Sequence, residues 1–169
     1  MARPKTPKLP VNKTLLSEVL QRASNAKTKA EKIAILQEYK SPALTKILLC
    51  NFAKSVRFTF PDGKTPFTEN EVPKGINHQM LYNEHKMIEK FIVKDIAPGF
   101  TVYGCSGRAE PRIQPLKKEA LWIQLLEALH VDEANLMDLV KDKKLTDVYK
   151  ITRQNVIDAF PELGLQNEK

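Results

Sequence analysis

Apolar residues recur at three- and four-residue intervals over most of the chain, which is the spacing of one face of an α-helix. The first such face is formed by Leu15, Leu16, Val19, Leu20 and Ala23. Thr28 followed by Glu31 has the spacing of a capping box, and Ser41 followed by Pro42 is a helix start with proline in its first turn. Three short helices are therefore expected between residues 14 and 53.

The middle of the chain has a different pattern, because residues 56–60 alternate between apolar and polar as a strand does. The only good candidate to pair with it is the extended segment from Phe100 to Gly104. We expect either a small two-stranded ribbon of these segments or an irregular loop. Between them, the spacing of apolar residues predicts a long helix from about Ile76 to Lys94.

The C-terminal part returns to helical spacing. The most apolar helix begins at Pro115, contains the only tryptophan, Trp122, and is expected to be central. Val131 and Asp132 have the pattern of a staple residue and an N-cap, and a last helix is expected to start at Thr152. The fold class is mainly α, with about six to seven helices in one domain over residues 13–164. A basic arm at 1–12 precedes it, and a short tail at 165–169 follows.

Charge adds a candidate function to this picture. The chain carries 27 Lys and Arg against 20 Asp and Glu, a formal charge of +7, which favours polyanions as partners. The basic residues cluster in the arm, before and within the start of the Pro115 helix, and after residue 140. The candidate contacts to nucleic acid or another polyanion are Arg3, Lys5, Lys8, Arg108, Arg112, Lys117, Lys118, Lys141, Lys143, Lys144, Lys150 and Arg153.

One of these clusters, from Gly104 to Lys118, has two interpretations. Its glycines could let the backbone approach a phosphate at a helix start, with Arg108 and Arg112 as bidentate contacts. Alternatively, the glycines form a turn and the basic residues are a solvated rim. Cations in a first helical turn are slightly unfavourable against the helix dipole, so Lys117 and Lys118 favour a negative partner.

No pattern in the sequence indicates an enzyme. The motifs of a serine nucleophile, a phosphate-binding loop and a zinc protease are absent, and the three histidines lack ligand spacing. We therefore expect no catalytic residue, no metal ligand and no cofactor. Cys50 and Cys105 are expected to be reduced thiols, although their positions leave a disulfide open. The longest apolar run is too short to span a membrane, and no signal peptide is recognisable.

Four blocks of the sequence resemble a family of small proteins from tailed bacteriophages, including phages of marine cyanobacteria. The blocks are "SEVLQRASNAKTKAEKIAILQEYKSPALTKIL", "FPDGKTPFTENEVPKG", "KKEALWIQLLEALHVDEANLMDLVKDKKL" and "YKITRQNVIDAFPEL". The resemblance extends from about Leu15 to Leu163. It implies a phage origin and synthesis in the cytoplasm of a bacterial host. The family is one of unknown function, so the resemblance implies no catalytic residues.

Charge and resemblance together lead to two hypotheses. The first is a non-enzymatic phage accessory protein that binds nucleic acid, or a nucleoprotein machine of replication or transcription, through its basic patches. The second is a structural component of the virion, or an adaptor that binds a host or phage protein. Neither involves a membrane, and neither specifies an oligomeric state.

Overall fold

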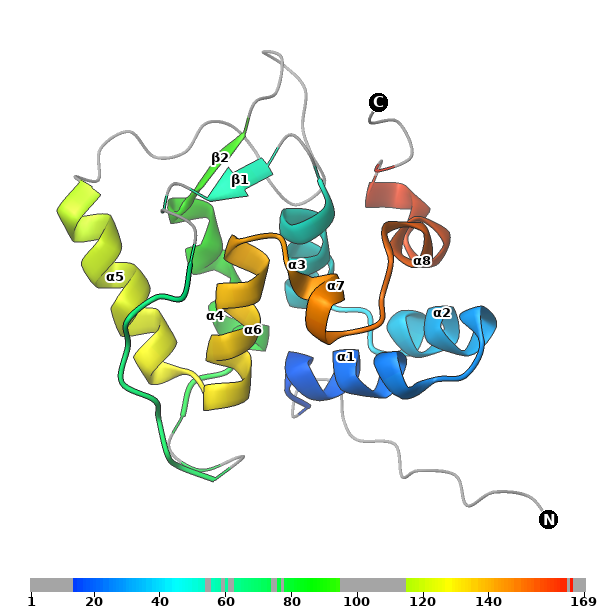
Figure 1. The fold of residues 1–169 in the computed structure, drawn as a ribbon, viewed down its shortest axis with the longest axis horizontal. Helices are drawn as coiled ribbons and strands as arrows, with labels where there is room; N and C mark the ends of the chain where they lie inside the picture. Colours follow the sequence, from blue (N-terminus) through cyan, green and yellow to red (C-terminus); the bar gives the residue numbers. More distant parts are fainter. Residues whose placement is uncertain are drawn as a thin grey trace.

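Helices dominate the computed structural model, which describes residues 14–53, 56–58, 60, 63–73, 76, 78–94, 115–163 and 165 (Figure 1). The predicted arm and the segment from Phe100 to Gly104, with Cys105, lie outside the described residues. In chain order the elements are α1 (Leu16–Asn25), α2 (Lys29–Glu38), α3 (Pro42–Phe52), β1 (Val56–Phe58), α4 (Leu81–Glu84), a 3-10 helix (His85–Lys90), β2 (Ile92–Lys94), α5 (Pro115–Ala128), α6 (Val131–Lys141), α7 (Leu145–Val148), α8 (Arg153–Ala159) and a second 3-10 helix (Pro161–Leu163). The prediction of a mainly α fold is confirmed.

Local capping signals fix where several helices begin. The Thr28 side chain accepts a hydrogen bond from Glu31 N at the start of α2, and Ser41 Oγ accepts one from Leu44 N at the start of α3. Thr152 forms a full capping box with Asn155 at the start of α8. These three starts agree with the sequence because each cap acts on a neighbour three residues away.

The start of α6 differs from the prediction by two residues. His130, rather than Asp132, is the N-cap, and its ring Nδ1 accepts a hydrogen bond from Asp132 N at 3.1 Å. A ring nitrogen can cap a helix as a hydroxyl or carboxylate oxygen does, because any acceptor can take the unpaired N–H. Asp132 is instead placed in the first turn, where its charge suits the helix dipole.

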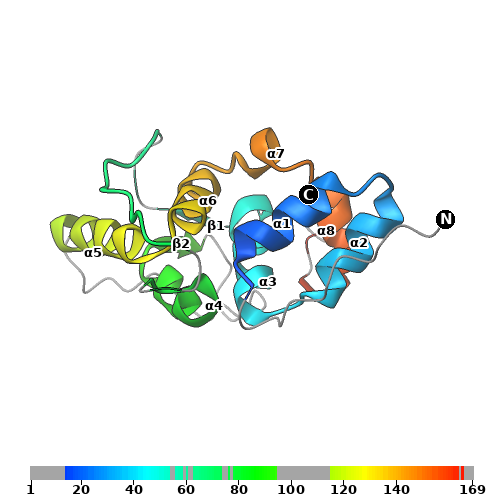
Figure 2. The ribbon, with the colours of Figure 1, turned by 90° about the horizontal axis from the view of Figure 1, so that it is seen from below.

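The central helix is α3 rather than α5. Residues 43–51 of α3 are all buried, whereas Leu116 at the start of α5 is 81 % exposed. Figures 1 and 2 both show α5 at one end of the molecule, α3 and α6 in the middle, and α2 with α8 towards the other end. α5 is therefore less buried than its strongly apolar sequence predicts, because only part of its circumference contacts the core.

A two-stranded ribbon takes up the last three residues of the predicted long helix. β1 pairs antiparallel with β2, with Val56 opposite Lys94 and Phe58 opposite Ile92. The prediction of one helix from Ile76 to Lys94 is wrong, since the described residues of this range form α4 and a 3-10 helix before β2. The β-branched residues of β2 suit a strand, and pairing with the distant β1 decides the outcome.

Several aromatic rings of the core gather around Trp122, which is 1 % exposed. Its ring centroid lies 5.5 Å from that of Phe58 and 5.3 Å from those of Phe60 and Phe91, which are common separations for aromatic pairs. The indole Nε1 donates a hydrogen bond to Thr65 Oγ1 at 3.2 Å. The predicted packing role of the tryptophan is confirmed, and its polar atom is satisfied.

A fully buried carboxylate joins three helices. Glu133 in α6 accepts a hydrogen bond from Leu16 N, at the start of α1, and another from Leu81 N, at the start of α4, each at 3.1 Å. Its burial raises the pKa of Glu133 to about 7, although the two backbone N–H groups act in the opposite direction. This contact fixes α1 relative to α6, and these two helices form two walls of the candidate site.

A groove between α1, α6 and the α7 turn

The structure separates the predicted basic contacts into groups with different environments. Arg3, Lys5, Lys8, Arg108 and Arg112 lie outside the described residues.

Three of the remaining basic residues hold the fold together. Lys141 is buried, and its Nζ lies 2.7 Å from Asp142 Oδ1 and 2.9 Å from the carbonyl oxygen of Gly63. Lys143 donates to the carbonyl oxygen of Ala53. Arg153 donates to the carbonyl oxygens of Phe52 and Leu165. Lys141 in particular is not on the surface, where a phosphate contact would require it.

The other four, Lys117, Lys118, Lys144 and Lys150, are exposed or half-buried. Lys117 and Lys118 are in the first turn of α5, whereas Lys144 precedes α7 and Lys150 follows it. Figures 1 and 2 show the start of α5 and α7 well apart. Among the residues that the structure describes, the predicted basic contacts therefore do not gather into one surface.

A concave feature lies elsewhere, along α6. A first chamber of about 370 Å³ opens between α1 and the start of α6, and a second of about 530 Å³ lies between α6, the turn after α7 and Lys64. Both chambers are lined by Asp132 and Tyr149, so they adjoin, and we call the two together the α1–α6 groove.

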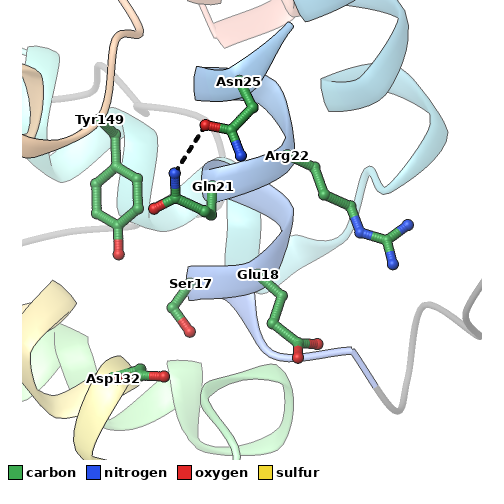
Figure 3. A pocket seen from close by; sticks show the side chains of 7 residues that line it. All are labelled: Ser17, Glu18, Gln21, Arg22, Asn25, Asp132 and Tyr149. Carbon is green, nitrogen blue, oxygen red and sulfur yellow. Dashed lines mark hydrogen bonds between the residues drawn. The ribbon is translucent and has the colours of Figure 1, made fainter. Parts of the chain in front are cut away.

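The polar face of α1 forms one wall of the groove. It contributes Ser17, Glu18, Gln21, Arg22 and Asn25. These residues recur at helical spacing on the side opposite the buried apolar face that the sequence predicts, so one amphipathic helix supplies both core and wall. Within the wall, Gln21 Nε2 donates to Asn25 Oδ1 at 3.0 Å (Figure 3).

The opposite wall combines carboxylates with apolar side chains. Leu139 is half-buried and Val148 is 55 % exposed, and both line the second chamber. Asp138 accepts from Thr65 Oγ1 at 2.6 Å, and Asp142 accepts from Gly63 N at 3.1 Å. These two carboxylates therefore fix the loop at residues 63–65 against α6, and both already accept hydrogen bonds from it.

Carboxylates outnumber cations in the lining of the groove, although one of them, Asp142, is paired with Lys141. Its lining contains the carboxylates of Glu18, Asp132, Asp138 and Asp142 against two cations, Arg22 and Lys64. The Asp132 side chain is 52 % exposed, so its charge faces solvent. Burial, followed by the charge of Asp132, raises the pKa of Tyr149, so its hydroxyl remains protonated at neutral pH. The groove is thus acidic although the whole chain has a charge of +7.

The sequence interpretation missed this groove. Its walls come from residues 17–25 and 132–149, which nothing in the sequence connects. The only available signal was the polar face of α1, and every surface helix has such a face.

Two further features, a metal site and a membrane-spanning helix, are absent from the described parts of the chain. No group of three or more His, Cys, Asp or Glu side chains there could hold a metal ion. No helix of those parts is long and apolar enough to cross a membrane.

Comparison with known proteins identifies one family. A model described as a family of unknown function, DUF6433, matches residues 19–147, which extend from α1 into α7 and include most of the groove. Neither a curated protein nor a solved structure matches the chain. Because the match covers more than half of the 169 residues, the chain belongs to this family of unknown function.

Proposed function

We propose that the protein is a non-enzymatic adaptor of a tailed bacteriophage that binds a basic segment of another protein in the α1–α6 groove. The observation that carries this proposal is the acidic groove itself, since it joins exposed negative charge to partly exposed apolar side chains. A partner segment with Lys or Arg beside apolar residues would complement both. The phage origin and the host cytoplasm as its place of action rest on the resemblance of the sequence blocks.

This proposal retains part of the nucleoprotein hypothesis. Proteins that bind nucleic acid are rich in basic segments, so an acidic groove suits a protein component of a replication or transcription complex. A groove lined by carboxylates would repel phosphate. The groove would therefore bind a protein component of the replication or transcription complex, and we expect no direct contact between the groove and nucleic acid.

Direct nucleic-acid binding remains the second candidate, favoured by one observation. The first turn of α5 contains Lys117 and Lys118 and no acidic residue. No hydrogen bond or ion pair holds either side chain within the described part of the chain. Two such cations at a helix start are suited to contact with phosphates, independently of the groove.

Site-specific cross-linking distinguishes the two candidates. A photoreactive amino acid replaces Val148 in the groove or, as a matched control, Leu116, which is exposed beside the two α5 lysines. Each variant is produced in phage-infected cells, irradiated, and treated with nuclease. The adaptor proposal predicts a protein adduct at position 148 that survives nuclease and is lost when Asp132→Asn is added. The absence of that adduct would contradict the proposal, and an adduct at position 116 that nuclease removes would support the second candidate.

The second experiment measures binding of the purified protein to duplex and single-stranded DNA. At about 50 mM salt, backbone contacts are at their strongest. We expect no binding under these conditions. Salt-sensitive binding that Lys117→Gln with Lys118→Gln abolishes would establish the second candidate instead.

A further inference from the structure

The turn between α5 and α6 brings three segments of the chain together at one histidine. His130 is the N-cap of α6, and its side chain is 9 % exposed. The segment before α4 pairs with this turn, because Gln79 N donates to the carbonyl oxygen of Ala128 at 2.8 Å and Gln79 forms a bridge with Leu129. This pairing places the His78 ring against that of His130, with the centroids 5.3 Å apart and the planes at 73°. A change in the charge of His130 therefore acts where α5, α6 and the segment before α4 meet.

One ring nitrogen of His130 faces two groups of the same neighbour. Nδ1 accepts the cap bond from Asp132 N at 3.1 Å and lies 3.8 Å from Asp132 Oδ2. Because a backbone N–H can only donate, Nδ1 carries no proton in this arrangement, and the neutral ring has its proton on Nε2. A proton on Nδ1 would oppose the N–H of Asp132, whereas the carboxylate of Asp132 would accept from it. The two groups therefore suit the two charge states of the ring.

We propose that the start of α6 is a pH-sensitive switch, in which a proton on His130 Nδ1 replaces the cap bond from Asp132 N by an ion pair with the Asp132 carboxylate. The neutral ring caps α6 and leaves the carboxylate at the groove. The charged ring uncaps the first turn of α6 and draws the carboxylate toward the turn between α5 and α6.

Several titratable groups lie on the elements that pack against this turn and the start of α6. Besides Asp132, they are Glu18 of α1, Lys46 of α3, His78 before α4, Glu127 of α5, Glu133 of α6 and Tyr149 after α7. Lys46 is the only charged residue of α3, and Glu127 accepts from Thr68 N at 3.0 Å. The two that the structure places directly at the His130 ring are Asp132 and His78.

These surroundings set the direction in which the switch responds. Burial and the cap bond both favour the neutral ring, and a charged His78 would oppose a second positive charge beside it. The carboxylate of Asp132 acts in the opposite direction. The capped state is therefore expected at pH 8, and the exchange is expected on the acidic side of neutrality, where histidine takes up a proton.

The switch links pH to the charge of the groove. Asp132 lines both chambers and its side chain is 52 % exposed, and Figure 3 shows its carboxylate directed toward α1. An ion pair with His130 would neutralise this carboxylate, so acidification would reduce the negative charge of the groove. Weaker binding of a basic segment at low pH is the consequence, and this last step alone rests on the proposed function.

NMR of the free full-length protein tests the switch directly. Long-range proton–nitrogen spectra of the imidazoles report which ring nitrogen carries a proton, and backbone spectra follow the Asp132 amide from pH 8 to pH 5. We expect His130 to have its proton on Nε2 at pH 8, and then to gain one on Nδ1 with the same midpoint as a shift of the Asp132 amide. Hydrogen exchange of that amide, corrected for its intrinsic pH dependence, should become about fivefold faster as the bond is lost.

Four substitutions assign the response to His130. His130→Asn keeps an N-cap acceptor without a titrating ring, so the Asp132 amide should stay constant over the same range. Asp132→Asn keeps the N–H but removes the carboxylate, so His130 should take up its proton only at a more acidic pH. The response should persist in His78→Gln and in Glu133→Gln, which remove the neighbouring histidine and a carboxyl group whose pKa is raised to about 7.

Three results would overturn the switch: a proton on His130 Nδ1 at pH 8, a ring that stays neutral at pH 5, or a shift of the Asp132 amide that survives His130→Asn. The switch and the adaptor function fail separately, because the NMR experiments use the protein without a partner. A nuclease-resistant adduct at position 148 without the pH response would leave the adaptor and remove its switch. The pH response without such an adduct would leave the switch and remove the adaptor.

Discussion

Replacing Glu133 by glutamine tests how the fold tolerates a buried carboxylate. The wild-type side chain is 0 % exposed and receives two backbone N–H groups, from Leu16 and Leu81. Glutamine has nearly the same volume and never ionises. Its amide can accept from one of the two N–H groups but presents N–H donors to the other, which adds a destabilisation that does not change with pH.

The pH dependence is set by the direction of the pKa shift. Burial raises the pKa of Glu133 from 4.5 to about 7, so between these values the folded protein binds more protons than the unfolded chain. The free energy of unfolding therefore falls as pH rises through this window. At about 1.4 kcal/mol per pKa unit, the wild type loses at most about 3 kcal/mol that Glu133→Gln does not lose.

Urea unfolding at pH 5, 6, 7 and 8, followed by the fluorescence of the single tryptophan, measures this difference. Subtracting the variant from the wild type removes the contributions of titrating groups that do not interact with Glu133. Glu119→Gln serves as the control and should follow the wild type. If the difference between wild type and Glu133→Gln stays constant from pH 5 to pH 8, the assigned burial cost is wrong.

Three further substitutions test the packing and capping interactions. Ser41→Ala removes the hydrogen bond to Leu44 N and should lower the free energy of unfolding by about 1 kcal/mol in urea, whereas an unchanged midpoint would show that this cap is dispensable. Trp122→Ala should cost about 3–5 kcal/mol by calorimetry or circular dichroism, and a loss below about 1 kcal/mol would contradict its position in the core. Arg153→Met keeps much of the side-chain length but removes the bonds to two backbone carbonyls. It should cost about 2 kcal/mol, and an unchanged melting temperature would refute that role.

The parts of the fold that the sequence predicted are those determined by neighbouring residues. The starts of α2, α3 and α8 depend on a cap and its partner three residues away. The buried face of α1 depends on helical spacing alone. Such information lies within a few turns of chain and can be read without knowing which element packs against it.

The parts that were missed depend on distant partners. Ile92 to Lys94 continued a helical pattern, yet β1 pairs with this segment across more than thirty residues. Glu133 stands in the first turn of α6, where acidic residues are common, whereas its partners Leu16 and Leu81 are distant in sequence. The groove was missed for the same reason, because Ser17 and Tyr149 come together only in the folded chain.

The packing of α8 on α2 has a consequence for how the protein can be divided. Gln37 Nε2 donates to the carbonyl oxygen of Ala159 at 3.1 Å, and Lys29 Nζ lies 2.6 Å from Asp158 Oδ2. The family match ends at residue 147 and starts at residue 19, so it includes neither α8 nor Leu16. A fragment cut at those limits would leave one side of α2 uncovered and the Glu133 carboxylate without one of its donors. The family match is therefore narrower than the set of elements that pack together, and we expect stable recombinant fragments of this protein to extend past it at both ends.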